Sequence, residues 1–426
     1  MKPNVRVFLF LLVAFTGGVI AQFKLYETRD LRLIYFGDAQ SYVALHVARC
    51  YENTLRFESR LFDYATPEKT FILLHDFNDY GNAGAGVTPR NHIALGIAPL
   101  SYAWDISPAN ERMNSTLNHE LVHLITLDQA AASDRFFRHV FFGKVRPDYA
   151  DPLTLVYGYL TTPRRFSPRW YQEGIAVFME TWMAGGLGRT LGAYDEMAFR
   201  TMVKENAAMY DRVGLESAGT RIDFQVGANA YMYGTRFYSY LALQHGPEKL
   251  IQWTSRKDGS RAYFASAFRQ VYGQSLDDAW EEWLRWERGF QAANLARLAE
   301  NPITPDKPIT QQDLGSVSRP WYDPEGREIY VAVNYPGQAA HIAALGLETG
   351  RLRKITLVKG PALYYVTALA FDPAGRMLYY TTDNNDWRDL LQVDPATGKS
   401  RHLMKDCRVG DLAWNAADNS QWGIPL

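Results

Sequence analysis

Residues 117–125 read Leu-Asn-His-Glu-Leu-Val-His-Leu-Ile, an apolar stretch interrupted by His119, Glu120 and His123. The apolar spacing predicts a helix over residues 107–127, with a Ser-Pro pair at its start. Positions i and i+4 share one face of a helix, so both histidines can bind one metal ion. Glu120 lies beside them, where it can reach a water molecule on that metal. The alternative is a surface helix with two fortuitous histidines.

A second segment, residues 168–180, reads Pro-Arg-Trp-Tyr-Gln-Glu-Gly-Ile-Ala-Val-Phe-Met-Glu, and its Ser-Pro start predicts another helix. The segment resembles the Trp-x-x-Glu-Gly-x-Ala-x-x-x-Glu segment of gluzincin metallopeptidases, particularly the peptidase-MA-like families and the neutral-zinc aminopeptidases. The resemblance extends, patchily, over residues 71–283. It implies an α+β, zincin-like domain that holds one Zn²⁺ per chain through His119, His123 and Glu173.

Two further carboxylates are candidates to support a ligand histidine. Glu180 lies two turns beyond Glu173 on the same side of its helix, although it could also be an ordinary solvated glutamate. Asp128, at the end of the first helix, is a weaker candidate for the same supporting role.

Residues 231–241 begin Tyr-Met-Tyr-Gly and resemble the Tyr-x-x-Gly segment of the aminopeptidase-type gluzincins. In those enzymes the first tyrosine donates a hydrogen bond to the tetrahedral intermediate, which implies this role for Tyr231. Tyr233 and Tyr240 are alternatives, and any of the three could be a core aromatic residue.

The chain departs from the aminopeptidases in one respect. Their Gly-x-Met-Glu-Asn strand, whose glutamate binds the substrate amine, has no counterpart, because the corresponding residues 87–95 contain no carboxylate. This favours cleavage at internal peptide bonds. We expect a substrate strand to pair with the sheet edge near residues 91–97.

The first 21 residues have the layout of a secretory signal peptide: basic Lys2 and Arg6, an apolar run over residues 7–20, and cleavage after Ala21. The alternative is an uncleaved membrane anchor, but the run is shorter than the roughly 20 residues that a spanning helix needs. No second stretch is long enough to cross a bilayer. We therefore expect an exported protein, periplasmic or secreted.

Residues 22–300 are predicted to form the zincin-like domain, with its metal site within residues 107–180. Hydrophobic periodicity and turn residues place the elements of this domain. We expect a helix over residues 39–62, strands over residues 70–75 and 91–97, a Gly/Asn-rich turn over residues 80–86, and helices through most of residues 231–298.

A Pro-rich linker, residues 301–316, precedes a β region over residues 317–426. Residues 323–330 recur at 372–379, a shift of 372 − 323 = 49 residues that is typical of propeller blades. This region resembles TolB-like periplasmic propellers. A third copy begins near residue 411 and stops at Leu426, so we expect incomplete blades and a fragment of a longer product, or else a non-propeller packing.

Composition restricts the partners. The net charge of −1 does not point to nucleic acid or to an anionic membrane surface. The aromatic and basic insertion over residues 130–166 is expected to pack on the domain, and the alternative is a flap or a membrane-touching loop. Cys50 and Cys407 are expected to be separate buried thiols.

The expected reaction is zinc-dependent hydrolysis of peptide bonds in exported proteins or peptides, through a zinc-bound water activated by Glu120 as general base. Two alternatives remain open. The zincin domain could be a catalytically silent scaffold whose propeller-like region binds a protein or cell-envelope partner. The zinc enzyme could also hydrolyse something other than a peptide.

Overall fold

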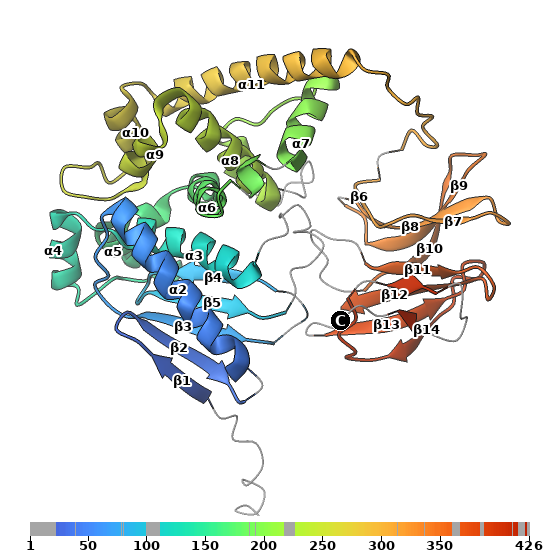
Figure 1. Cartoon of the computed structure of the whole chain (residues 1–426), viewed down its shortest axis with the longest axis horizontal. Coiled ribbons are helices and arrows are strands. Elements are labelled where there is room, and N and C mark those ends of the chain that lie inside the picture. The colour runs from blue at the N-terminus through green and yellow to red at the C-terminus, as the bar shows by residue number, and fades with distance from the viewer. Residues whose placement is uncertain are drawn as a thin grey trace, which may run out of the picture.

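The structure is a computed structural model of mixed α and β composition, with helices and several sheets (Figure 1). It describes residues 23–38, 40–77, 79, 81–98, 111–186, 188–191, 193–216, 226–312, 314–335, 337–359, 367–383, 387–410, 412–415 and 422–423. The predicted signal peptide lies outside these ranges. In the part of the chain that is described, no helix is both long and apolar enough to span a membrane.

The N-terminal sheet contains five strands in the order β1-β2-β3-β5-β4. They are β1 (Phe23–Glu27), β2 (Leu31–Phe36), β3 (Thr70–His75), β4 (Ala83–Gly86) and β5 (His92–Gly96). The pairs β2–β3 and β3–β5 are parallel, whereas the two edge strands pair antiparallel with their neighbours. Alternate residues of β2 and β3 are buried, so one face of the sheet lies against helices.

Two predictions for this sheet are wrong. Residues 80–86 do not form only a turn, because β4 within them pairs with β5. The small residues of β4, Ala-Gly-Ala-Gly, give no β-forming signal in the sequence, and pairing with β5 determines their conformation. The strand β5 lies between β3 and β4, so the edge available to a substrate strand belongs to β4 and not to residues 91–97.

The buried face of the sheet supports α2 (Ser41–Phe62) and α3 (Arg112–Asp128), which also pack against each other (Figure 1). The N-cap of α3 is Glu111, whose carboxylate accepts hydrogen bonds from the backbone N–H groups of Met113 and Asn114. The helix α3 thus begins at Arg112, and the predicted start at residues 107–108 lies outside the described residues. The carboxylate takes the capping role expected of a serine, and its charge suits the helix N-terminus.

The insertion after α3 contains α4 (Ala132–Val140), α5 (Leu153–Thr161) and the short helix η2 (Pro163–Phe166). It packs on the domain through a fully buried Arg164, which donates a hydrogen bond to the Trp253 carbonyl. It also leaves aromatic side chains in solvent, with Phe142 100% and Tyr149 89% exposed. The predicted packing is confirmed for the inner side of the insertion, and its outer side is apolar and exposed.

The remaining helices lie on the side of α3 that faces away from the N-terminal sheet (Figure 1). They are α6 (Arg169–Met183), η3 (Arg189–Leu191), α7 (Ala193–Lys204), η4 (Gly214–Glu216), α8 (Val226–His245), α9 (Pro247–Thr254), α10 (Phe264–Tyr272) and α11 (Leu276–Ala299). Trp170 of α6 is fully buried among aromatic rings, including Trp280 at 4.9 Å and Phe237 at 6.0 Å between ring centroids. The helical prediction for residues 231–298 is confirmed.

The β region forms two antiparallel sheets of similar plan. The first contains β6 (Ser316–Val317), β7 (Trp321–Asp323), β8 (Glu328–Asn334), β9 (His341–Gly346) and β10 (Leu352–Leu357), and the second contains β11 (Leu369–Asp372), β12 (Met377–Asp383), β13 (Arg388–Val393) and β14 (Ser400–Met404). The strand β12 repeats β8 with the predicted shift, 377 − 328 = 49 residues. A pair of two-residue strands follows, β15 (Ala413–Trp414) and β16 (Trp422–Gly423). The described residues of this region close no propeller ring.

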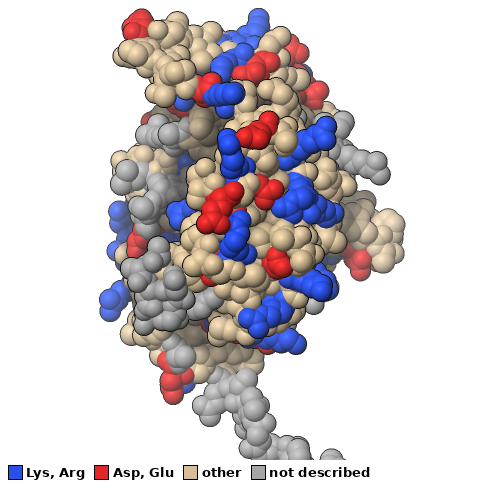
Figure 2. All heavy atoms as spheres, turned by 90° about the vertical axis from the view of Figure 1, so that its right-hand side faces the viewer, with Lys and Arg blue, Asp and Glu red and all other residues tan. Residues whose placement is uncertain are grey.

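The two β sheets share a core, in which the rings of Tyr330 and Phe371 lie 4.9 Å apart. Basic and acidic side chains are interspersed over the face of the molecule that Figure 2 shows. The β region contacts the N-terminal sheet through Arg408, which donates to Asp79 at 2.8 Å and to Asp76 at 2.7 Å. Asp76 directly follows β3 and Asp79 lies three residues further on, so these ion pairs join the segment after β3 to the β region.

Candidate metal centre

Three side chains from α3 and α6 converge on one point. The Nε2 atoms of His119 and His123 lie 3.0 Å apart. The Glu173 Oε2 atom lies 3.2 Å from His119 Nε2 and 3.1 Å from His123 Nε2. All three residues are at most 9% exposed.

This triangle fits a zinc ion. Zinc–nitrogen and zinc–oxygen bonds of about 2.0–2.1 Å in tetrahedral geometry place neighbouring donor atoms about 3.3 Å apart. The three observed distances come close to that value, and the chemistry of two imidazoles and one carboxylate is that of catalytic zinc sites. Three protein ligands leave the fourth tetrahedral position for water or substrate.

Glu173 reaches the histidines because α6 crosses α8 at two glycines. A Cβ atom on Gly234 would lie 2.3 Å from the Trp170 carbonyl oxygen, and one on Gly174 would lie 2.6 Å from the Tyr238 ring. Only glycine permits this approach between the helix backbones. The crossing therefore fixes the position of α6, and with it the position of Glu173 relative to His119 and His123 on α3.

A chain of charges orients the first histidine. His119 Nδ1 lies 2.8 Å from Glu180 Oε2, and Arg189 donates to both oxygens of Glu180 at 2.7 Å. An ionised carboxylate only accepts, so Nδ1 carries the proton and the lone pair of neutral His119 is on Nε2. Burial alone would raise the pKa of Glu180, but Arg189 and His119 hold it at about 2. The structure thus places Glu180 where the supporting role predicts.

Sequence reasoning missed Arg189. It comes from η3, after a glycine-rich turn that follows α6, and no motif in the sequence marks it. Its guanidinium lies 5.3 Å from the centroid of the Tyr231 ring, so it contacts both Glu180 and the candidate catalytic tyrosine. Only the position of its turn beside α3 and α8 brings it to the site.

A metal ion at this site would have to displace a proton from His119. Burial alone lowers the pKa of His119, but hydrogen bonds to Glu173 and Glu180 raise it to about 10 in the metal-free protein. The same histidines hold the pKa of Glu173 well below its usual range, against the effect of burial. The metal-free site is therefore held together by an imidazolium and its carboxylates.

Glu120 lies beside the three ligands and is itself buried, at 6% exposure. Burial raises the pKa of its carboxyl group, and the positive charges of His119 and His123 oppose this effect. Its carboxylate also accepts a hydrogen bond from the Ala85 backbone on β4. Glu120 thus lies between α3 and the edge strand, with a raised pKa that suits a general base and acid.

The structure separates the three candidate tyrosines. The Tyr231 ring lies 6.0 Å from the His119 ring and 5.4 Å from the Arg169 guanidinium, so it belongs to the site. Burial raises the pKa of its hydroxyl group. Tyr233 is instead a core residue at 1% exposure, and Tyr240 packs against Trp286 at 5.2 Å.

Asp128 belongs to a different network. Its carboxylate accepts hydrogen bonds from Tyr64 at 2.6 Å, Asn91 at 2.9 Å and Lys144 at 2.9 Å. It therefore fixes the end of α3 to the sheet and to the insertion, and it does not orient a ligand histidine as expected. The Nδ1 atom of His123 is buried and has no hydrogen-bond partner among the described residues.

No family model matches the sequence, and no curated protein matches it. Among solved structures, TolB from Acinetobacter baumannii is similar at 20% identity and a TM-score of 0.20, over 23% of this chain and 24% of that one. Aminopeptidase A from Legionella pneumophila, in complex with aspartic acid, is similar at 11% identity and a TM-score of 0.34, over 90% of this chain and 35% of that one. An aminopeptidase N family protein from Idiomarina loihiensis is similar at 12% identity and a TM-score of 0.27, over 91% of this chain and 69% of that one. This chain thus spans about a quarter of the TolB chain and about a third of the Legionella enzyme. All three likenesses are distant.

Proposed function

We propose that the protein is a zinc metallopeptidase that hydrolyses internal peptide bonds of exported proteins or peptides. The observation that carries the proposal is the convergence of His119, His123 and Glu173, with Glu120 buried beside them. A structural zinc site needs ligands only, whereas a buried carboxylate next to three ligands suits hydrolysis. The signal-like first 21 residues support action outside the cytoplasm, in the periplasm or after secretion.

Each residue of the site has a distinct task in this proposal. His119, His123 and Glu173 would hold a zinc ion, which would supply Lewis-acid polarisation of a carbonyl group and make a water molecule more acidic. Glu120 accepts the proton of the attacking water and delivers it to the leaving amine. Tyr231 donates a hydrogen bond to the oxyanion, and Glu180 with Arg189 keeps His119 in the tautomer that binds metal.

The edge strand supports cleavage at internal bonds. The strand β4 contains only alanine and glycine, so it presents backbone groups and no carboxylate to the substrate. An extended peptide can pair with such an edge along its whole length. Because no side chain of β4 can bind a free amine, the substrate need not begin at the site.

We also propose a division of the chain into three parts. In it, residues 22–300 are a zincin-like domain, residues 301–316 a linker, and residues 317–426 propeller-like blades. The two meander sheets and their 49-residue repeat support the blade assignment. The exposed side of these sheets is then a candidate surface for a protein partner.

The decisive experiment compares Glu120→Gln with wild type for zinc content and for hydrolysis of unfolded casein. We expect unchanged zinc and a loss of hydrolysis of at least about 100-fold, because only the proton acceptor is removed. Glu58→Gln is the matched control, since Glu58 is also a buried glutamate and burial raises the pKa of its carboxyl group well above its usual range. Proteolysis that persists in zinc-loaded Glu120→Gln would refute the mechanism.

The same assay separates the alternatives. Wild-type protein that binds zinc but cleaves no peptide would indicate a silent scaffold or another substrate. Hydrolysis of simple esters or amides without casein cleavage would select the second of these. Loss of activity on chelation and its return with zinc would tie the reaction to the metal.

A further inference from the structure

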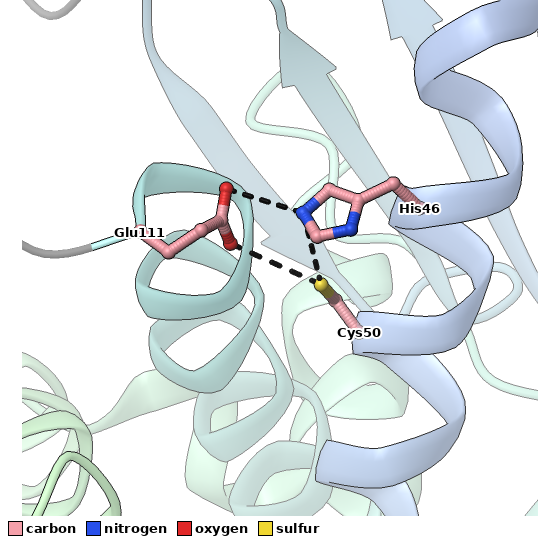
Figure 3. A group of neighbouring side chains, drawn as sticks. All are labelled: His46, Cys50 and Glu111. Carbon is pink, nitrogen blue, oxygen red and sulfur yellow. Dashed lines mark hydrogen bonds and ion pairs between the residues drawn. The ribbon is translucent and has the colours of Figure 1, made fainter.

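A second group of metal-binding side chains lies away from the candidate catalytic centre. His46 and Cys50 project from successive turns of α2, and Glu111 faces them from the N-cap of α3 (Figure 3). The His46 Nε2 atom lies 3.2 Å from Glu111 Oε1 and 3.6 Å from Cys50 Sγ. Cys50 Sγ lies 4.0 Å from the other carboxylate oxygen, Glu111 Oε2.

The arrangement does not fit a nucleophilic cysteine. In a Cys-His-acid relay, one imidazole nitrogen faces the thiol and the other faces the carboxylate. Here both partners face the same atom, His46 Nε2. Three donor atoms that converge on one point are instead typical of ligands around a metal ion.

The distances fit tetrahedral zinc. A zinc–sulfur bond of about 2.3 Å and zinc–nitrogen or zinc–oxygen bonds of about 2.0–2.1 Å predict donor separations of about 3.6 Å and about 3.3 Å. The separations of 3.6 Å for nitrogen and sulfur and 3.2 Å for nitrogen and oxygen agree with these values. The sulfur–oxygen distance of 4.0 Å is to the second oxygen, Glu111 Oε2, so rotation of the half-exposed Glu111 side chain must bring one oxygen within about 3.6 Å of the sulfur and about 3.3 Å of the imidazole nitrogen.

The surroundings also suit a metal. His46 and Cys50 are four residues apart on a helix, which is the spacing that presents two ligands on one face. The side chains of His46 and Glu111 are 46% and 49% exposed, so the group is open to solvent for metal entry and for a water ligand. Cys50 is 6% exposed, which shields its sulfur.

The charges and hydrogen bonds of the group are also compatible with a zinc ion. Glu111 also caps α3, with Oε1 accepting from the Met113 N–H and Oε2 from the Asn114 N–H, and a carboxylate oxygen that accepts an N–H can also bind a metal through its second lone pair. A dication near a helix N-terminus is unfavourable by itself. A thiolate and a carboxylate carry two negative charges, which neutralise the ion at this position.

We propose that His46 Nε2, Cys50 Sγ and a carboxylate oxygen of Glu111 form a second zinc site, with water as the fourth ligand. The site ties α2 to the first turn of α3, the helix that carries His119 and His123. It does not depend on the proposed peptidase activity, because it shares no ligand with the candidate catalytic centre.

Cobalt(II) tests the proposal, because a thiolate ligand to cobalt gives a charge-transfer band in the near ultraviolet. The catalytic group has no sulfur, so the band reports the second site alone. We expect the full chain, reduced and metal-stripped, to bind two cobalt ions and to show the band. Cys50→Ser should bind one ion and lose the band, whereas Cys407→Ser and His123→Ala should keep the band.

His46→Gln provides a variant with little risk to folding, because His46 is half exposed. We expect it to weaken cobalt binding at the second site at least about tenfold. His139→Gln, which changes another exposed helical histidine, is the matched control and should bind as wild type does. A band that is absent from wild type, survives in Cys50→Ser, or is lost in Cys50→Ser but unaffected by His46→Gln would overturn the proposed three-ligand site.

Discussion

The crossing of α6 and α8 makes a sharp prediction for Gly234→Ala. The added Cβ would lie 2.3 Å from the Trp170 carbonyl oxygen and 3.1 Å from the Gly174 Cα. A carbon–oxygen contact needs about 3.3 Å, so the helices must separate by about 1 Å. Neither neighbour can rotate away, because both are backbone atoms.

The expected cost follows from two opposing effects. Overpacking of this kind costs about 1–3 kcal/mol, and a backbone clash belongs at the upper end of that range. Alanine gains about 1 kcal/mol over glycine inside a helix. We therefore expect Gly234→Ala to lower the free energy of unfolding by about 2 kcal/mol. Because Glu173 moves with α6, zinc binding should also weaken at least about tenfold.

Gly289→Ala is the matched control. Gly289 lies in the interior of α11, and a Cβ there meets nothing within 4 Å. The same substitution should therefore stabilise the protein by about 1 kcal/mol and leave zinc binding unchanged. Denaturant unfolding with a chelator present, and zinc titration of the folded protein, measure both quantities. If Gly234→Ala proved as stable as Gly289→Ala, the close crossing of α6 and α8 would be wrong.

Three further predictions concern charged groups around the site. Glu180→Gln removes the ionised carboxylate that accepts a hydrogen bond from His119. Zinc affinity, measured by competitive chelator titration, should therefore fall about 10- to 100-fold while the fold is retained. An unchanged zinc affinity would show that Glu180 does not support the metal ligands. Zinc affinity should rise about tenfold per pH unit between about pH 6 and pH 9. The reason is that the pKa of metal-free His119 is about 10 and its proton must leave before metal binds. A zinc affinity that does not change with pH would contradict this raised pKa. Burial raises the pKa of Glu58 well above its usual range, so unfolding releases its proton once the pH exceeds the unfolded pKa of about 4.3. Wild-type stability should then fall relative to Glu58→Gln by about 1.4 kcal/mol per pH unit up to the folded pKa, and parallel pH–stability curves for the two proteins would refute a neutral Glu58.

The sequence predicts the site where spacing within one helix fixes geometry. His119 and His123 share a face because they are four residues apart, and Glu173 and Glu180 do so because they are seven apart. The same reasoning cannot find Arg189, which reaches the site from a turn whose position depends on how the helices pack. Spacing along one helix therefore identifies residues such as His119 and Glu173, but it cannot identify a residue such as Arg189 that tertiary packing brings to the site.

Two wrong predictions have related physical causes. The strand β4 has no β-forming residues, and only its pairing with β5 makes it a strand. Asp128 is the last residue of the ligand helix, but its carboxylate accepts hydrogen bonds from Lys144 of the insertion and from Asn91, which precedes β5. In both cases the decisive partner is distant in sequence, so tertiary contacts override the local signal.

The ligand helix α3 is fixed along its whole length. Glu111 caps its start, Asn118 meets Thr54 of α2 near its middle, and Asp128 fastens its end to the insertion. Glu173 comes from a separate helix that the glycine crossing holds in place. A metal bound between them would join two helices that are already held in place. In this structure His119 pairs with Glu173 and Glu180, and these contacts connect the same two helices. For this reason metal binding should draw little on refolding of the chain, and its strength should depend on how accurately α3 and α6 are spaced.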